Sequence, residues 1–240
     1  MRNKSHFQFK QFTVSHARST MKVGTDTVLL GAWVKVDQAK SVLDIGTGNG
    51  TIALMLAQRS AENATIDAVE IEGADVVQAE ENFRESPWSA KIQLHHTSIQ
   101  NFFPGKKYDL IVSNPPYFNN SQRPPDERRH QARHTISLPY DDLIGVGIRL
   151  LKDNGKFNVV LPFTEGLHFL ELAKQYGLYC SRRYSFRTRS EKSIERWLLE
   201  FSKNQHLEDR GEILLYDKGE EWSKEYTELT ADFYFRPKIK

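Results

Sequence analysis

The sequence predicts an α/β fold in which helices cover both faces of a mainly parallel sheet. From residue 41 to about residue 201, short β-rich runs alternate with helical stretches, which is typical of that architecture. The chain has 240 residues, a length that suits one large domain. The sequence contains no fixed-period repeat or low-complexity segment, which excludes solenoids and propellers.

The first part of the chain predicts a small extension, residues 1–34, packed on a core domain of residues 35–240. Apolar residues that alternate with polar ones predict a short hairpin at Phe7, Phe9, Phe12 and Val14. Residues 25–33 then predict a helix with Thr25 or Asp26 as the capping residue at its start. We expect the extension and the core to form a single structural domain.

The core domain follows as alternating strands and helices. Runs of β-branched and aromatic residues predict strands at 41–45, 65–71, 92–97, 108–113 and 157–161. Apolar periodicity predicts helices at 50–59, 74–84, 140–151 and 165–176. A terminal antiparallel pair, joined by a basic loop, is predicted at 178–186 and 196–203. The long loop between Pro115 and Pro139 carries several arginines, and loops of that length are usually functional or disordered.

The composition limits the class of protein. Cys180 is the single cysteine, which excludes an internal disulfide and a cysteine-rich zinc site. The longest apolar stretches, such as 52–57, fall far short of the ~20 residues that a membrane span needs. The first residues lack the apolar core of a secretory signal. We therefore expect a soluble cytoplasmic protein without a membrane partner, and no obligate protein partner is evident.

The net charge of +2 is unevenly distributed along the chain. Residues 1–22 carry five basic and no acidic side chains, and residues 182–196 carry six basic and two acidic ones. Residues 205–232 carry nine acidic and three basic side chains. Such asymmetry is typical of a protein that meets a polyanion with one face. Taken alone, the pattern favours the alternative that lysines and arginines simply solvate the surface.

The strongest motif is the stretch Val42-Leu-Asp-Ile-Gly-Thr-Gly-Asn-Gly50, a predicted buried strand that turns into a helix. Glycines let a ligand approach the backbone closely, and the helix start offers free N–H groups. A dinucleotide fingerprint would need its third glycine where Thr51 stands. The spacing Asp44-x-Gly46-x-Gly48-x-Gly50 instead resembles the first motif of class I S-adenosylmethionine (SAM) methyltransferases. A cationic sulfonium ligand suits an acidic residue in this turn, and a purely structural glycine turn is the alternative.

Glu70 ends the second predicted strand, 26 residues after Asp44. An acidic side chain at this place can accept both ribose hydroxyls of an adenosine cofactor. An exposed carboxylate at a strand end is the alternative. After the third predicted strand, the resemblance implies an acidic residue near the cofactor adenine, and this sequence has Ser98 there.

The fourth predicted strand ends in Asn114-Pro115-Pro116-Tyr117. Two prolines cannot continue a central ladder, so the chain leaves the sheet at the edge where ligands of open α/β sheets bind. The motif resembles the catalytic motif of methyltransferases that act on adenine N6, glutamine N5 or guanine N2. The resemblance implies that Asn114 and the Pro115 carbonyl accept the two amino hydrogens while Tyr117 stacks on the target. A proline-terminated strand without function is the alternative.

The chain as a whole resembles one family, the bacterial tRNA1(Val) adenine-N6 methyltransferases. The resemblance rests on the run from Phe7 to Trp33, the glycine turn, Asn-Pro-Pro-Tyr, and the closing Leu229-Thr-Ala-Asp-Phe-Tyr234. It implies a class I SAM-methyltransferase (Rossmann-like) fold with a seven-stranded, mainly parallel sheet and an antiparallel final strand. It also implies SAM as the cofactor and adenine 37, next to the anticodon, as the target. Lys22, Gly24 and Thr25 would then lie near the methionine end of SAM.

RNA binding needs contacts to phosphates together with stacking on unpaired bases. The loop after Asn-Pro-Pro-Tyr supplies the first group of candidates, Arg123, Arg128, Arg129, Arg133 and His134. A second group consists of Arg182, Arg183, Arg187 and Arg189. We expect the partner to be the anticodon stem-loop of tRNA1(Val). A base in that loop is already unpaired, so it costs less to extrude than a base in a duplex.

Three functions remain open, and a tRNA adenine-N6 methyltransferase is the favoured one. The second is another amino methyltransferase, acting on release-factor glutamine or rRNA guanine, and the third is a SAM-sensing RNA-binding module without turnover. His130 and His134 have the spacing of zinc ligands on a helix. Gln131 replaces the glutamate of the zinc motif, and arginines surround the pair, so we expect no metal.

Overall fold

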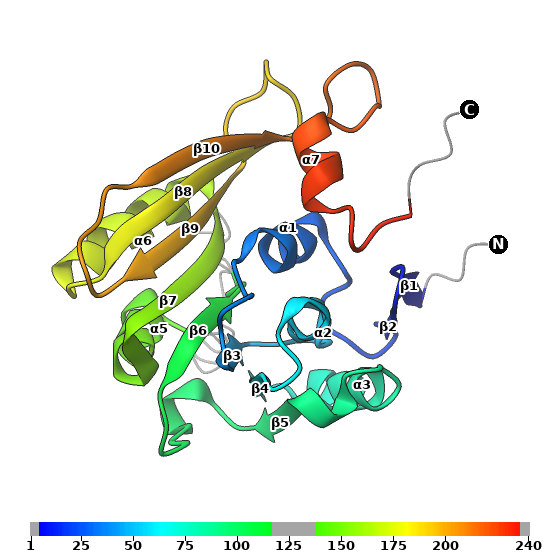
Figure 1. Cartoon of the computed structure of the whole chain (residues 1–240), viewed down its shortest axis with the longest axis vertical. Helices are drawn as coiled ribbons and strands as arrows, with labels where there is room; N and C mark the ends of the chain where they lie inside the picture. Colours follow the sequence, from blue (N-terminus) through cyan, green and yellow to red (C-terminus); the bar gives the residue numbers. More distant parts are fainter. Residues whose placement is uncertain (1–4, 117–137, 236–240) are drawn as a thin grey trace, which may run out of the picture.

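The computed structural model describes residues 5–116 and 138–235 (Figure 1). The strands of its main sheet are β3 (Ser41–Ile45), β4 (Thr65–Glu70), β5 (Ile92–His96), β6 (Tyr108–Ser113), β7 (Leu151–Pro162), β8 (Tyr179–Arg187), β9 (Arg196–Ser202) and β10 (Asp209–Leu214). The helices are α1 (Thr25–Trp33), α2 (Thr51–Arg59), α3 (Gly73–Arg84), α5 (Tyr140–Leu150), α6 (Phe163–Gln175) and α7 (Lys224–Leu229), with 3₁₀ turns η1 (Ser89–Lys91) and η2 (Ile99–Asn101). The predicted α/β class is confirmed. Among the described helices, none has the length and apolar character needed to cross a membrane.

Two apolar clusters, one on each face of the sheet, hold the helices in place. One cluster packs α1, α2 and α3 against strand residues that include Val42 and Ile66. The other packs α5 and α6 against strand residues that include Leu43 and Ile111. The neighbours Val42 and Leu43 thus face opposite sides, as the two-residue period of a strand requires. Helices cover both faces of the sheet, as the sequence predicts.

The strands β5, β4, β3, β6 and β7 lie side by side in that order and are parallel. The predicted bounds 41–45 and 108–113 coincide with β3 and β6. Because parallel strands end at the same edge, three sequence motifs meet there. They are the glycine turn after β3, Glu70 at the end of β4, and Asn114 after β6.

β7 begins earlier than the predicted strand at 157–161. It starts at Leu151, directly after α5, and its register with β6 shifts between Tyr108 and Leu110. Residues 152–154 are exposed, and their polar sequence Lys-Asp-Asn is typical of a turn. An irregular and solvated strand start therefore gives no alternation that a sequence pattern could detect.

The last three strands extend the sheet on the other side of β7. The predicted antiparallel pair is confirmed as β8 and β9, and β9 lies between β7 and β8, antiparallel to both. Within residues 5–116 and 138–235, the sheet has eight strands rather than the expected seven, because β10 pairs in parallel with β8. In β10 only Ile213 is buried, so the segment lacks the apolar pattern of a strand. Backbone pairing and ion pairs to arginines of β8 hold it instead.

The N-terminal extension forms the predicted hairpin, β1 (His6–Gln8) and β2 (Thr13–Ser15), followed by α1. The helix begins at Thr25 as predicted, but Gly24 is its N-cap, and no side chain caps it. Asp26 forms an ion pair with Arg196 instead of capping. The extension and the core share one apolar cluster, which supports the expected single domain.

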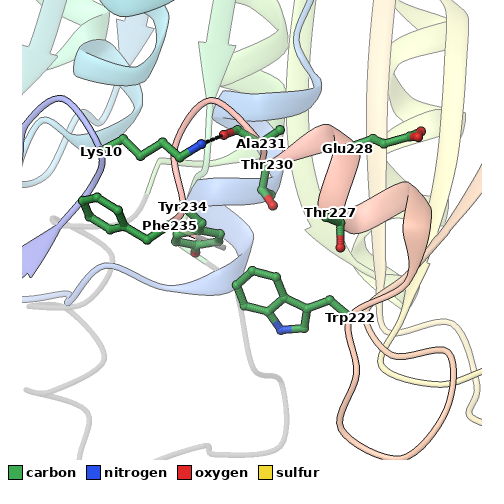
Figure 2. Close-up of a pocket in the computed structure, with 8 residues that line it drawn as sticks. All are labelled: Lys10, Trp222, Thr227, Glu228, Thr230, Ala231, Tyr234 and Phe235. Atoms are coloured by element: carbon green, nitrogen blue, oxygen red, sulfur yellow. Dashed lines mark hydrogen bonds between the residues drawn. The ribbon is translucent and has the colours of Figure 1, made fainter. Parts of the chain in front are cut away.

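The hairpin also contacts the closing segment of the described chain. The Lys10 N–H donates to the Phe233 carbonyl at 2.8 Å, and the Lys10 ammonium donates to the Ala231 carbonyl. Figure 2 shows this contact beside a cavity of about 160 Å³ lined by Trp222 and Tyr234. The two segments that carry the family resemblance at the ends of the chain thus pack on each other.

Candidate active site

The glycine turn between β3 and α2 bends through residues with positive φ angles. Gly46 and Gly48 have φ values of 70° and 56°, and a Cβ at either position would meet no atom within 4 Å. Gly50 differs, because a Cβ there would lie 2.4 Å from the ring of Phe83. Gly46 and Gly48 therefore leave open space for a ligand, whereas Gly50 lets α3 pack against the turn. The expected contact of Gly50 with the cofactor stays a prediction beside this packing role.

A cavity of about 1130 Å³ opens at the carboxyl edge of β3, β4 and β6. Its floor comes from these strand ends, and its wall comes from the segment before α1 and the first turn of that helix. The predicted site residues that line it are Lys22, Gly24, Thr25, Gly46, Gly48, Glu70, Ser98, Asn114, Pro115 and Pro116. The sheet topology thus gathers residues that are as many as 94 positions apart in the sequence, from Lys22 to Pro116.

Glu70 is buried at the end of β4 and turns its carboxylate toward the glycine turn. One oxygen accepts a hydrogen bond from the Gly48 N–H at 2.8 Å. The other oxygen accepts bonds from the backbone N–H groups of Ile71 and Glu72 at 2.8 and 2.9 Å. Because a carboxylate has roughly four acceptor positions, about one is left for a ligand hydroxyl in this arrangement.

Asp44 lies behind the cavity rather than in its wall. Its side chain is fully buried at the end of β3, and the Thr47 hydroxyl donates to its Oδ2 at 2.7 Å. Burial raises the pKa of Asp44 to about 7, and the nearby Glu70 carboxylate adds to this rise. Thr47 itself lines the cavity. Asp44 supports the turn that lines the cavity, and its expected contact with the cofactor stays a prediction.

Asn114 follows β6 and is half-buried at the cavity wall. Its Nδ2 donates to the Thr27 hydroxyl at 3.4 Å, which connects the motif after β6 with the start of α1. The preceding Ser113 hydroxyl donates to the Ile45 carbonyl at 3.0 Å and ties β6 to β3. The other predicted residues of this motif and its loop lie outside the described residues: Tyr117, Arg123, Arg128, Arg129, Arg133 and His134.

Four further residues shape the site without a clear signal in the sequence. Asn49, inside the glycine turn, donates from Nδ2 to the Met21 carbonyl at 3.1 Å. Asp75, in the first turn of α3, accepts two hydrogen bonds from Thr20. Asp26 and Arg196 form an ion pair of 2.8 Å at the cavity wall. Asn49 stands within the glycine motif and Asp26 within the run from Phe7 to Trp33, whereas Asp75 and Arg196 stand in no motif.

The second predicted RNA group has protein partners in the structure. Arg182 is buried, lies 4.1 Å from the ring centroid of Trp33, and pairs with Glu200 and Asp209. This burial argues against the expected contact of Arg182 with RNA. The side chains of Arg183 and Arg187 pair with Glu208 and Glu212 at 2.9 and 2.8 Å. Arg189 lies over the ring of Tyr216.

The residues of the large cavity suit SAM. The open positions at Gly46 and Gly48 give room for a ligand, and the Glu70 carboxylate can accept from a ribose hydroxyl. Lys22 and the start of α1 also line the cavity, and they offer positive potential to a carboxylate such as that of methionine. The smaller cavity beside Lys10 shares no lining residue with this one. Fold and cavity together define a class I SAM-dependent methyltransferase.

Comparisons with known proteins identify the family. Residues 13–178 match the model of the methyltransferase small domain. A relative from Trichodesmium erythraeum is 42% identical over 235 residues, 97% of this chain and 98% of the relative. One from Photorhabdus laumondii is 43% identical over 230 residues, 95% of this chain and 94% of the relative. Both relatives bear the name tRNA1(Val) (adenine(37)-N6)-methyltransferase. The chain belongs to the methyltransferase small domain family and, within it, groups with these relatives.

Solved structures agree on the fold. A predicted O-methyltransferase from Agrobacterium tumefaciens superposes with a TM-score of 0.68 at 15% identity, covering 87% of this chain and 96% of that one. A ribosomal protein L11 methylase from Lactobacillus delbrueckii gives a TM-score of 0.57 at 17% identity, covering 80% and 84%. At such low identity, these similarities concern the fold alone.

Proposed function

We propose that this protein transfers a methyl group from SAM to the N6 amine of adenine 37 in tRNA1(Val). The observation that carries the proposal is the position of Asn114 and Pro115 on the same cavity as Gly46, Gly48 and Glu70. An acceptor amine held at the first pair and a methyl donor held over the glycines would share one space. The names of the relatives supply the identity of the acceptor.

The chain's own residues prepare the amine for attack. SAM, when bound, supplies a methyl group activated by the sulfonium charge. The Nδ2 of Asn114 donates to the Thr27 hydroxyl, and the Oδ1 of an amide is an acceptor that suits an amino hydrogen. The Pro115 carbonyl accepts the second hydrogen. Both bonds withdraw the nitrogen lone pair from conjugation with the ring and turn it toward the methyl group.

Alignment supplies most of the acceleration in this scheme, because holding two reactants in place replaces a bimolecular encounter. A strong general base is not required, since the nitrogen can lose its proton after the new bond forms. Asp44 does not take this role, because it is fully buried and lies outside the cavity wall. The scheme therefore depends on two acceptors and a shaped cavity rather than on an ionised side chain.

The position of the site at the carboxyl edge of the sheet also indicates where an RNA partner would bind. We expect the anticodon stem-loop of tRNA1(Val) to approach the carboxyl edge of the sheet, with an unpaired adenine entering beside Asn114. The loop that joins β8 and β9 lies at this edge and contains Arg189 and Lys192. A protein that modifies tRNA is expected in the cytoplasm.

Transfer of a labelled methyl group from SAM to tRNA tests the proposal. The purified protein is incubated with bulk tRNA and with tRNA1(Val) transcripts, and the modified nucleoside is identified by mass spectrometry. We expect N6-methyladenosine in tRNA1(Val), and its loss when adenine 37 is replaced by guanine. A label in guanosine or in a release factor would show that the protein methylates another acceptor. Tight SAM binding without product would show that the protein is a binding module and not an enzyme.

A further inference from the structure

Residues 20–27, which we call the strap, line much of the large cavity. The strap joins the hairpin of the extension to α1, and it crosses from α3 at one end to β9 at the other. Apart from Val23, each of its residues lines the cavity. Most of the strap has no regular secondary structure. Side-chain contacts with the core must therefore set its position.

The first end of the strap is held by α3. The Thr20 hydroxyl donates to Asp75 Oδ2 at 2.7 Å, and the Thr20 N–H donates to Oδ1 at 3.2 Å. Asp75 is buried, which makes these charge-assisted bonds stronger than bonds at an exposed site. Next along the strap, the Met21 carbonyl accepts a bond from Asn49 in the glycine turn. The strap is thus registered directly against the turn that faces the ligand.

The second end of the strap is held by the ion pair between Asp26 and Arg196. The Nε of Arg196 donates to Asp26 Oδ2 at 2.8 Å, and its Nη1 donates to the Glu195 carbonyl at 2.9 Å. Arg196 is paired in register with Pro162 of β7, so a rigid strand carries the guanidinium. The side chains of Arg196 and Asp26 are 30% and 20% exposed, so solvent screens this pair less than a surface pair.

We propose that Asp26 and Arg196 are positioning residues for the SAM cavity. Their ion pair fixes the first turn of α1, and it thereby holds Lys22, Gly24 and Thr25 in the wall of the cavity. The inference rests on the proposed function only in taking SAM as the ligand. It assigns Arg196 to the strap and not to RNA, although this arginine lies close to the acceptor side of the cavity.

Binding of S-adenosylhomocysteine, the product form of the cofactor, tests the proposal by isothermal titration calorimetry. We expect Arg196→Met and Asp26→Asn each to weaken binding about tenfold, a loss typical of one charge-assisted hydrogen bond. The double exchange Asp26→Arg with Arg196→Asp restores the opposite charges, and we expect it to recover affinity to within about threefold of the wild type. Amide hydrogens of residues 20–27 should exchange faster in the single variants.

Lys152→Met provides the matched control. The pair of Lys152 and Asp109 also has a distance of 2.8 Å, but it lies at the other edge of the sheet, where β6 and β7 begin. We expect wild-type affinity for S-adenosylhomocysteine in this variant. Circular dichroism and thermal unfolding of every variant confirm that loss of affinity does not reflect a loss of fold.

Two results would overturn the proposal. Wild-type affinity in both single variants would show that the strap does not need the pair. Failure of the double exchange to recover affinity, with a folded protein, would show that the ion pair itself does not position the strap. Because the assay uses no methyl acceptor, absence of tRNA methylation would refute the proposed function and leave this test intact.

Discussion

The two halves of the sheet use charged and polar side chains in opposite ways. In the half formed by β3, β4 and β6, Glu70 and Asn114 stand at strand ends, where the topology opens a cavity. In the half formed by β8, β9 and β10, Arg182 and Arg183 stand within β8 and meet the carboxylates of Glu200 and Glu208. Side chains at the carboxyl ends of β3, β4 and β6 line a cavity, whereas arginines along β8 meet carboxylates of the protein itself.

This contrast teaches how far a charge pattern can be trusted. The basic stretch 182–196 and the acidic stretch 205–232 look like two separate surfaces in the sequence. The structure places parts of them on neighbouring strands, β8 and β10, where they neutralise each other. The net charge of a segment therefore indicates that the segment meets opposite charges. The fold decides whether RNA or another strand supplies those charges.

Substitution of Asn114 by alanine should have the largest effect in the cavity half. Loss of an acceptor for the amino hydrogens removes the alignment of the lone pair, and we expect the turnover number to fall on the order of 10²–10³-fold. Affinity for S-adenosylhomocysteine should stay unchanged, because the glycine turn and Glu70 are intact. Asn63→Ala, in an exposed loop, is the control. Wild-type turnover in Asn114→Ala would contradict the proposed role of the amide.

Substitution of Asp44 by asparagine should change how stability depends on pH. The folded-state pKa of Asp44 is raised from 3.8 to about 7, so the folded protein binds a proton that the unfolded chain releases in this range. The stability that this proton brings is present below about pH 4 and is lost as pH rises to 7, a difference of about 4 kcal/mol.

Urea unfolding between pH 4 and pH 8 measures the effect of Asp44. The quantity of interest is the free energy of unfolding of Asp44→Asn minus that of the wild type. We expect this difference to increase as pH rises through this range, because the amide stays neutral. Asp37→Asn, at an exposed position, should follow the wild type. A constant difference between Asp44→Asn and the wild type would contradict the raised pKa.

Substitution of Glu200 by glutamine should affect the outer half of the sheet alone. Glu200 is buried and bonds both Ser181 and Arg182, so the change leaves a buried guanidinium short of a charge partner. We expect a loss of about 3 kcal/mol in the free energy of unfolding, with unchanged affinity for S-adenosylhomocysteine. Glu208→Gln, in a less buried pair with Arg183 of β8, should cost less than about 1 kcal/mol. Weaker ligand binding in Glu200→Gln would mean that the two halves are coupled.

The sequence predicts the cavity half far better than the outer half, for a physical reason. The glycine turn, Glu70 and Asn114 each stand at a strand end, and a parallel topology is enough to bring such ends together. β10 escapes prediction because its stability comes from pairing with β8 and not from an apolar pattern of its own. Arg196 and Asp75 escape because their roles depend on contacts with a segment remote in the sequence.

Two predicted residues of the glycine motif have contacts inside the protein that the sequence does not reveal. Asp44 and Gly50 belong to the motif, but a motif does not say which side of a turn faces the ligand. Asp44 lies on the buried side, where Thr47 bonds it, and Gly50 lies against Phe83. Only three-dimensional packing separates residues that contact a ligand from residues that support those contacts.

Substitution of Arg189 by alanine should have the smallest effect, and it compares two arginines within the basic stretch 182–196. Among the described residues, Arg189 has a ring contact with Tyr216 and no carboxylate at ion-pair distance, unlike its neighbours on β8. If it contacts a tRNA phosphate, Arg189→Ala should lower the slope of log affinity against log salt by about one unit. Arg183→Ala should leave this slope unchanged, because Glu208 already neutralises that side chain. Filter binding of tRNA across a salt series measures both slopes. Equal slopes in the two variants would show that ion pairing within the sheet does not decide which arginines contact RNA.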